Sequence, residues 1–481
     1  MARQATAHTT AHQTTPADIH TDPDPDDATA PTSELAAAGR AHRKVLPRSA
    51  HADYTPAKDR DPIAVLRRQH AGRDPELVKL RVERMLRNPY AFHRGSAAIQ
   101  AADLAHAATT GRDVTICGDA HLAGFGLFTL GRNGTAFDLG DLDDAGYGAW
   151  EWDLKRFVSS VVVAARNKRL SEDRAQTAAL EAAASYRIAL RQYLDLGTLD
   201  RFELRTDPTE GLRETNPQAK RPSSQRVVDH ALKAMRKRAA EHGVHTITDH
   251  SRGGLTFVES ASSLSRLSDT EASAVAAIVD AYRLAVAPDI ALLLSSFRDA
   301  DAARRVVGVA SVGIPRYLVA LTGPDDEPLV LEISAAMPSV ITEFAGGAAF
   351  DPSLVGRAND DDGERMLAAH SILHAVPDPF LARVESGGIV WCARRFRDGS
   401  VAINVDELDR RTFLDYVDAC GTVLARAHAQ SPNAPFIGGY MGSNTTFDQA
   451  IASWSTAYAD QCVADYRAVR KAARDGVSLT D

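Results

Sequence analysis

Five aspartates in one short stretch are the residues of this sequence best suited to chemistry. Two apolar, β-rich runs, residues 125–130 and 135–139, are separated by Gly-Arg-Asn-Gly, which predicts a β-hairpin. Because a hairpin returns the chain to its start, carboxylates at its ends should gather at one end of a small sheet. There they could share a metal ion or hold a phosphate-bearing substrate. The aspartates are Asp119, just before the hairpin, and Asp138, Asp141, Asp143 and Asp144 at its far end.

A glycine-bounded segment much later in the chain is a second candidate. Residues 308–313, Gly-Val-Ala-Ser-Val-Gly, lie between two predicted strands, where backbone N–H groups around Gly308, Ser311 and Gly313 could cover phosphates. No Lys-Ser or Lys-Thr follows, and a strand comes next instead of a helix, so this is not a Walker A loop. A plain tight turn is the other interpretation. Arg94, next to the aspartate stretch, could bind an anion or form a structural salt bridge.

The composition is that of a soluble globular protein: 481 residues, 44% hydrophobic and 25% charged. This length predicts two or three domains. A formal net charge of -8 gives no support to a nucleic-acid binder, although a locally basic face stays open. No apolar stretch approaches the length of a membrane span. The four cysteines are widely scattered, which predicts neither a zinc site nor disulfides and favours a reducing cytoplasm as the location.

Helices and strands must hold these residues in place, and hydrophobic periodicity predicts where they run. Residues 1–50 have almost no large apolar side chains, so a disordered tail is expected. Ser171 is expected to cap a helix, and Ser268 and Glu271 to form a capping box. Helices are predicted at 61–108, interrupted by Pro89, and at 150–166, 171–194, 268–287, 411–429 and 446–473. Strands are predicted within 304–341, as strand, glycine loop, strand, turn and strand, and as a hairpin of 390–396 with 401–405.

The order strand, Gly-Asp, hairpin, Asp-rich segment and Trp-Asp-Leu at a helix start resembles the catalytic segments of aminoglycoside and choline phosphotransferases, which have a protein-kinase-like fold. The resemblance puts Asp119 in the place of the base that orients the acceptor hydroxyl. Asp141, or else Asp138, takes the place of the metal-binding aspartate, and Asp153 that of a structural aspartate. His121 either orders the loop or lies near the acceptor.

The sequence is more closely similar to a bacterial group, domain-of-unknown-function family 2252. The similar motifs cover most of the chain beyond residue 60: they lie at 92–95, 117–121, 138–144, 150–156, 306–313 and 458–461. Since that family is itself uncharacterised, the resemblance implies a kinase-like fold more firmly than a substrate.

The fold expected from these resemblances is α+β, a protein-kinase-like two-lobed fold with a largely helical catalytic lobe and a small antiparallel sheet lobe. The glycine loop of kinases precedes the catalytic loop, whereas residues 308–313 follow Asp119, so the expected fold is circularly permuted. The expected regions are a tail at 1–55, a helical catalytic region at 56–298, a β-rich nucleotide lobe at 299–405 and C-terminal helices at 406–481 packed on the catalytic lobe.

Three groups that the resemblance leads us to expect are missing. Gly124 stands where kinases have an Asn that holds a second metal ion, Ser334 where a phosphate-pairing Lys is expected, and residues 369–371, Ala-His-Ser, where the family usually has Gly-Gln-Arg. Each loss weakens phosphoryl transfer by on the order of a hundred- to a thousand-fold. The cations that could substitute are Arg94, Arg316, Arg394 and Arg397.

Two functions follow from this resemblance. The first is a kinase-like phosphotransferase that binds ATP and Mg²⁺ and transfers phosphate to a hydroxyl of an unknown small molecule or protein. The second is a catalytically impaired pseudokinase that acts as a binding or scaffold module. Metal-dependent hydrolysis by the aspartates is less favoured, because no His or Glu set has metal-ligand spacing. The acceptor, the nucleotide preference and the oligomeric state are left open.

Overall fold

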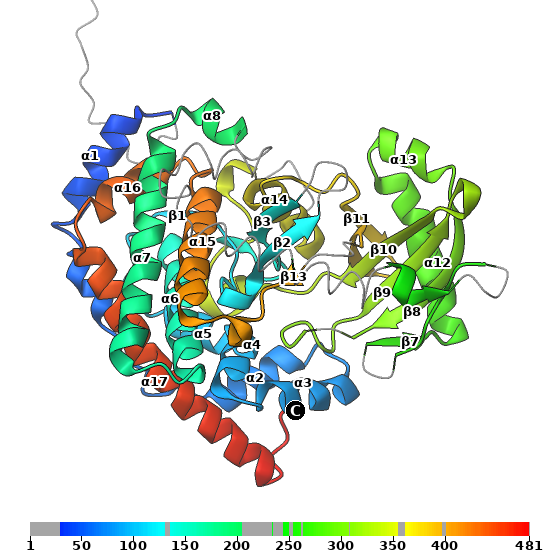
Figure 1. Ribbon diagram of the computed structural model, residues 1–481, viewed down its shortest axis with the longest axis horizontal. Helices are drawn as coiled ribbons and strands as arrows, with labels where there is room; N and C mark the ends of the chain where they lie inside the picture. The colour runs from blue at the N-terminus through cyan, green and yellow to red at the C-terminus, as the bar shows by residue number, and fades with distance from the viewer. Residues whose placement is uncertain are drawn as a thin grey trace, which may run out of the picture.

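The computed structural model describes residues 29–129, 135–203, 233, 244–249, 254–260, 263–306, 308–354, 361–396 and 401–480. It is a mixed α+β protein in which a large helical body lies beside a smaller lobe built on a twisted sheet (Figure 1). The α+β class predicted from the sequence is therefore confirmed. None of the described helices combines the length and the apolar composition that a membrane crossing needs. All four cysteines are free and buried.

The region at 61–108 forms four short helices instead of long ones. They are α2 (Pro62–His70), α3 (Pro75–Met85), α4 (Pro89–Gly95) and α5 (Ala97–Leu104). Proline begins three of them, because its missing N–H and fixed φ suit the first helical position. Asp61, Asp74 and Asn88 cap these three helices through their side chains. Pro89, which was predicted to interrupt a helix, therefore also starts the next one.

The centre of the helical body is α6 (Trp150–Asn167), which is buried on all sides except at its end. The predicted helices around it are present as α7 (Glu172–Leu194), α15 (Arg410–His428) and α17 (Thr446–Arg474), with α8 (Thr198–Glu203) and α16 (Ala434–Met441) in addition. Ser171 stands at the N-cap of α7, but its side chain makes no capping hydrogen bond, so that detail of the prediction is wrong. Chain segments from before and after the sheet lobe build this one core.

The expected tail at 1–55 is corrected for its second half. Helix α1 (Thr32–His42) packs against α16, and a 3₁₀ turn, η1 (Arg48–Ala52), packs against α17. A Cβ added at Gly39 would lie 2.1 Å from the Phe436 carbonyl oxygen, and one at Gly439 would lie 2.1 Å from the Ala36 carbonyl oxygen. Glycine and alanine let the two backbones touch, so no large apolar side chains were needed for docking. Residues 1–28 lie outside the described part of the chain.

The predicted hairpin that carries the aspartates is present. Strand β2 (Phe125–Thr129) pairs with β3 (Thr135–Leu139) in antiparallel register from Phe125 opposite Leu139 to Thr129 opposite Thr135. Its predicted turn, at 131–134, lies outside the described residues. Strand β1 (Asp113–Ile116), which precedes the hairpin, pairs with β4 (Gly146–Ala149), which follows it. The short turn η2 (Leu122–Gly124) leads into β2. The hairpin and this second strand pair thus enclose the aspartate segment.

The second predicted hairpin, of 390–396 with 401–405, is wrong. Strand β12 (Ile389–Arg395) pairs with β11 (Ala382–Ser386) and β10, whereas β13 (Val401–Ala402) pairs with β2 of the helical body. Gly387 and Gly388, with φ of 62° and 73°, form the tight turn between β11 and β12. Positive φ at both turn residues suits the twist of a two-residue hairpin, which is why the chain reverses there.

The sheet lobe is a six-stranded antiparallel sheet with the order β11-β12-β10-β9-β8-β7. Its other strands are β7 (Leu264–Arg266), β8 (Arg298–Arg305), β9 (Arg316–Thr322) and β10 (Pro328–Ala335). The two later strands predicted within 304–341 and the turn between them are confirmed, whereas the strand before the glycine loop lies earlier than predicted, because β8 already ends at Arg305. Helices α12 (Asp269–Ala285) and α13 (Pro288–Leu294) share a core with one face of this sheet. The predicted boundary between the helical region and the β-rich lobe, at 298/299, is therefore too late, because the apolar side of α12 is buried on the sheet.

The predicted capping box of Ser268 and Glu271 is present at the start of α12. Helix α14 (Asp362–Leu373) contacts β11 and β12 of the sheet lobe as well as β1 of the helical body. The remaining short elements are α11 (Val244–Ile247), β5 (Thr248–Asp249), β6 (Thr256–Phe257), η4 (Pro324–Asp326), η5 (Ile341–Ala345), η6 (Pro352–Leu354) and η7 (Val405–Glu407).

Candidate functional site

The loop that carries Asp119 is fixed by a carboxylate from α6. Asp153 accepts hydrogen bonds from the backbone N–H groups of Cys117, at 2.7 Å, and Gly118, at 3.0 Å. Gly118 has a φ of +77°, and a Cβ there would lie 1.9 Å from the Asp144 carbonyl oxygen. Glycine is thus needed at this position both for its backbone conformation and for the close contact between the loop and the aspartate turn. Asp153 therefore has a structural role in holding this loop.

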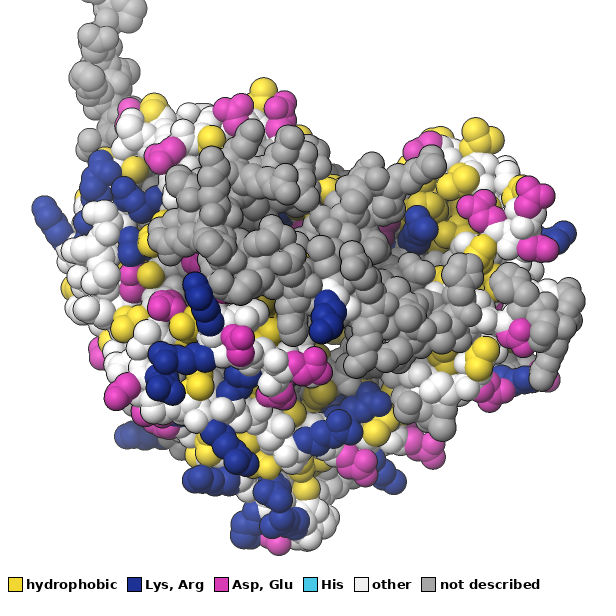
Figure 2. All heavy atoms as spheres, viewed as in Figure 1, with side chains coloured by type: hydrophobic (Ala, Val, Ile, Leu, Met, Phe, Trp, Pro, Cys, Tyr) yellow, Lys and Arg dark blue, Asp and Glu magenta, His cyan; other side chains and the backbone are white. Residues whose placement is uncertain are grey.

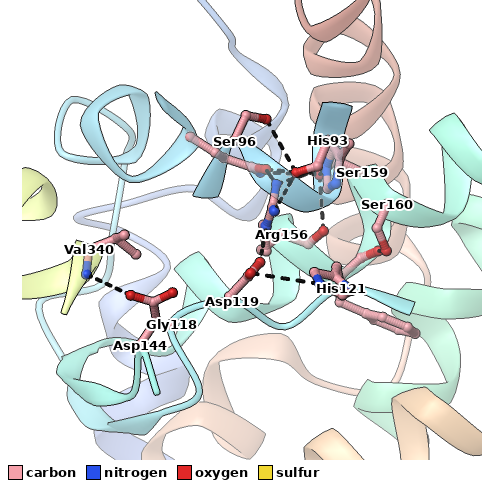
Figure 3. A network of polar contacts seen from close by, with 12 residues as sticks. His93, Ser96, Gly118, Asp119, His121, Asp144, Arg156, Ser159, Ser160 and Val340 are labelled. Carbon is pink, nitrogen blue, oxygen red and sulfur yellow. Dashed lines mark hydrogen bonds and ion pairs between the residues drawn. The ribbon is translucent and has the colours of Figure 1, made fainter. Parts of the chain in front are cut away.

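Asp119 itself is buried and ion-paired. Arg156, on the same helix as Asp153, donates from Nε to Asp119 Oδ1 at 2.8 Å (Figure 3). The other oxygen, Oδ2, lies 3.7 Å from His121 Nε2. Burial alone would raise the pKa of Asp119, but the positive charges of Arg156 and its neighbours outweigh this and hold the pKa below its usual value. Burial lowers the pKa of His121 to about 4, so its imidazole is neutral near pH 7.

The aspartate turn after β3 is held in a different way. Asp143 accepts from Arg316 Nη2 at 2.9 Å, and Asp144 accepts from the Val340 N–H at 3.0 Å. Solvent reaches Asp141, yet many protein atoms surround its carboxylate, and this desolvation together with the charge of Asp143 raises its pKa to about 7. Burial and the charge of Asp119 raise the pKa of Asp144 to about 6. Ionisation of Asp141 and Asp144 is therefore less favourable than that of an ordinary aspartate, because of desolvation and the neighbouring carboxylates.

The structure separates Asp138 from the other aspartates. Arg426 Nη2 donates to Asp138 Oδ1 at 2.6 Å, and the Ala375 N–H donates to Oδ2 at 2.7 Å. Both oxygens thus stabilise the packing of α15 and the segment after α14. Of the two aspartates predicted to bind metal, only Asp141 lines the cavity described next.

A cavity of about 410 Å³ brings the two predicted segments together. Asp141, Asp143 and Asp144 form one part of its wall, and Ala310 and Ser311 of the glycine loop form another. Gly308, by contrast, faces a second cavity together with Arg94. The glycine loop therefore lies between two cavities, and the predicted residues are divided between them.

Arginines from α3 and the turn before it fasten the glycine loop. Arg73 Nη1 donates to the carbonyl oxygens of Ala310, at 2.6 Å, and Val312, at 2.7 Å, while Arg84 Nη1 donates to the Gly308 carbonyl oxygen at 2.9 Å. Gly313 has a φ of +93°, and a Cβ there would lie 2.9 Å from Arg73 Cβ. Arg73 could not be predicted from the sequence, since no local pattern marks an arginine that binds a loop more than two hundred residues away.

A cluster of arginines on the sheet face stands beside the aspartates. Glu332 of β10 binds Arg305, Arg316 and Arg394. Burial would raise the pKa of Glu332, but these three guanidinium groups hold it well below its usual value. Arg316 is the cross-strand neighbour of Ser334, the position at which the resemblance to kinases led us to expect a lysine. A cation therefore lies on the strand next to Ser334.

Glu332 was also missed, although one signal marked it. The strand β10 has the sequence Pro-Leu-Val-Leu-Glu-Ile-Ser-Ala, in which one charged residue interrupts an apolar run. Such a residue on a buried strand needs partners, and alternation puts it on the face opposite Leu331 and Ile333, which pack on α12. On α14 neither Lys nor Arg stands at 369–371, but Arg365 of the same helix donates to the carbonyl oxygens of Asp143, at 2.9 Å, and Met337, at 2.7 Å. Arg397 lies outside the described residues.

The donor set around Asp141 can be compared with what a metal ion requires. Within the described ranges, no three His, Cys, Asp or Glu side chains are arranged to hold a metal by themselves. Mg²⁺, however, is commonly bound by one or two carboxylates, with water and substrate phosphates as its other ligands. Asp141 and Asp144, with their raised pKa values, fit that mode of binding, in which the cation would offset their repulsion.

Comparison with known proteins gives one positive result. Residues 73–472 match a family described as "uncharacterized protein conserved in bacteria (DUF2252)". No curated protein and no solved structure matches the chain. The matched range includes the Asp119 loop, the aspartate turn, Arg94 and the glycine loop. Because it covers well over half of the sequence, the chain belongs to this bacterial family of uncharacterised proteins.

Proposed function

We propose that this protein is a kinase-like phosphotransferase that binds a nucleotide, ATP in the simplest case, together with Mg²⁺. The observation that carries the proposal is the cavity of about 410 Å³ shared by the aspartate turn and the glycine loop. Two segments that are far apart in sequence meet there, as a permuted kinase-like site requires. The inserted position of the sheet lobe and the contact of α12 with that sheet also support this arrangement.

In this proposal each group has a role that follows from its surroundings. Asp141 and Asp144 would hold Mg²⁺, which would neutralise charge on the nucleotide phosphates. Arg316, next to Ser334 and bonded to Asp143, supplies the positive charge expected of the missing lysine. The backbone of Ala310 and Ser311, held by Arg73, covers the phosphates.

The transfer step assigns Asp119 to the acceptor. The acceptor hydroxyl oxygen forms a bond to the terminal phosphorus of the nucleotide, and the bond from that phosphorus to its bridging oxygen breaks. A nucleoside diphosphate leaves, and the hydroxyl proton passes to the Asp119 carboxylate, whose Oδ2 is the oxygen not used by Arg156. His121 positions the loop beside it as a neutral imidazole.

Ligand-dependent thermal stability tests the nucleotide part. We expect ATP with Mg²⁺ to raise the Tm of the full chain by a few degrees, because a ligand that binds only the folded state stabilises it. Asp141→Asn should abolish this shift. Asp280→Asn, at an exposed position on α12, removes the same charge elsewhere and should keep it. No shift in the wild type with millimolar ATP or GTP would refute nucleotide binding.

A binding module without turnover is the second candidate, and the Asp119–Arg156 pair favours it. A base held by a buried arginine gives up part of its basicity, since the cation stabilises the ionised form. Gly124 offers a test, because a Cβ there would make only ordinary van der Waals contacts, 3.7 Å from the Asp119 carbonyl oxygen and 3.9 Å from His121 Nδ1. If Gly124→Asn with Ser334→Lys gains ATP hydrolysis, the site is a weakened enzyme. Nucleotide binding without any gain would favour the binding module.

A further inference from the structure

The second cavity beside the glycine loop is lined by arginines. It has a volume of about 530 Å³ and lies between the α3–α4 region, the Gly308–Val309 end of the loop and residues 403–406. Arg84, Arg87 and Arg94 line it, and Asp406 is the only carboxylate among its described lining residues. The pocket, which we call the arginine pocket, is therefore positively charged although the whole chain carries a net charge of -8.

Two buried polar atoms at this pocket have no partner among the described residues. They are the Tyr90 hydroxyl and Arg94 Nε, four residues apart on α4 and thus on the same side of the helix. A buried donor without an acceptor is costly, so such atoms mark places where a ligand or water completes the bonding. Arg87 and Arg94 also form no ion pair with any described residue. The pocket therefore presents unused donors.

The arginine pocket is close to Asp119. Ala123, four residues after Asp119, lines it, and the charge of Arg94 contributes to the lowered pKa of Asp119 and of His121. The glycine loop separates it from the aspartate cavity, with Gly308 and Val309 on one side and Ala310 and Ser311 on the other. A ligand here would thus reach the Asp119 loop from a direction different from that of the nucleotide. Many Lys and Arg side chains also lie on the lower part of the face shown in Figure 2, toward α2 and α3.

We propose that the arginine pocket binds the phosphate group of the acceptor, and that the acceptor is a small phosphate monoester with a free hydroxyl. Guanidinium groups match phosphate oxygens in planar, two-bond geometry, and the Tyr90 hydroxyl adds a neutral donor. The volume suits a small molecule better than a protein segment. The acceptor role rests on the proposed phosphotransferase function, whereas phosphate binding at Arg94 does not.

Binding of inorganic phosphate by the full chain tests this site. We expect titration calorimetry at constant ionic strength to detect phosphate binding, and glycerol 3-phosphate to bind as well while glycerol does not. Arg94→Gln should weaken the affinity by about tenfold or more, because a charge-assisted hydrogen bond is lost. Tyr90→Phe should weaken it several-fold while leaving the Tm without ligand unchanged, since the hydroxyl has no described protein partner. Arg174→Gln, at an exposed position on α7, is the matched control and should bind as the wild type does.

The variants separate this proposal from the proposed function. Asp141→Asn should lose the nucleotide shift and keep phosphate binding, because its carboxylate lines the other cavity. If ATP has no effect while phosphate binding depends on Arg94, the arginine pocket stands and the phosphotransferase proposal fails. Wild-type protein that does not bind millimolar phosphate would overturn the pocket. Unchanged affinity in Tyr90→Phe would do the same, even if Arg94→Gln failed to fold.

Discussion

Asp119, which follows Gly118 in sequence, and the aspartates of the turn that contacts Gly118 differ in how their charge is neutralised. Asp119 is buried against Arg156 and has a lowered pKa. Asp141 and Asp144, in the turn that touches Gly118, have pKa values raised to about 7 and about 6. Asp119 has a counter-cation inside the fold, whereas Asp141 and Asp144 line a cavity and are harder to ionise than an ordinary aspartate.

This difference separates a carboxylate whose charge is neutralised inside the fold from carboxylates whose charge is left for a ligand to neutralise. An ion pair that satisfies itself contributes to the folded state whether or not a ligand is present. An excess of carboxylate charge at a cavity costs stability until a cation arrives, and such strain is typical of binding sites. Substitutions at Arg156, Gly118 and Asp141 test the contrast, in decreasing order of expected effect.

Removing the internal cation should have the largest effect. Arg156→Met leaves the Asp119 carboxylate buried without its partner and should lower the free energy of unfolding by about 3–5 kcal/mol. Urea denaturation measures this change. The double variant Asp119→Asn with Arg156→Met should regain part of the loss, since no uncompensated charge remains. A cost below about 1 kcal/mol for Arg156→Met would show that Asp119 is not held as a buried ion pair.

Disrupting the contact between Gly118 and the aspartate turn should cause the second-largest loss of stability. Gly118→Ala combines positive φ with a Cβ 1.9 Å from the Asp144 carbonyl oxygen, and should cost about 2–4 kcal/mol. Gly111 provides a matched control, because its φ is +66° and an added Cβ would meet nothing within 4 Å. Gly111→Ala should therefore cost only about 1 kcal/mol. Equal losses in the two variants would mean that backbone strain alone, without the contact to the aspartate turn, matters at Gly118.

Removing a carboxylate at the cavity should cause the smallest change in the free energy of unfolding, and this change should be stabilising. Asp141→Asn removes a repelled carboxylate and should raise the free energy of unfolding at pH 8 by no more than about 1 kcal/mol, since solvent screens the group. An unfolded Asp has a pKa of about 3.9, and Asp141 in the folded chain has one of about 7. Between these values the folded state binds the extra proton, so the wild type should lose stability relative to the variant as pH rises, and level off above pH 7.

Denaturation curves at several pH values, without added divalent cations, check this prediction. Asp280→Asn should give a pH dependence parallel to that of the wild type. A variant that is less stable than the wild type at pH 8 would contradict the excess of negative charge inferred around Asp141.

Much of the local structure could be predicted because its signals are local. The hairpin of β2 and β3, the capping box at Ser268 and the helices α6 and α15 follow from periodicity and turn chemistry within a few residues. The hairpin assigned to 390–405 failed because the partner of β13 is β2, which lies far away in sequence. Helix α1 was missed since its docking depends on close backbone contact at Gly39, not on large apolar side chains.

The candidate site shows the same division. The sequence by itself determined which residues could do chemistry, namely the aspartates around the hairpin, the glycine loop and Arg94, because residue type and short-range spacing are properties of the chain. Only the tertiary structure decided how they are grouped. Asp138 pairs with Arg426 and Asp119 with Arg156, whereas Asp141 lines the cavity at the glycine loop and Arg94 lines the arginine pocket. The reason is physical, since buried charges must find partners, and packing determines which partners are within reach.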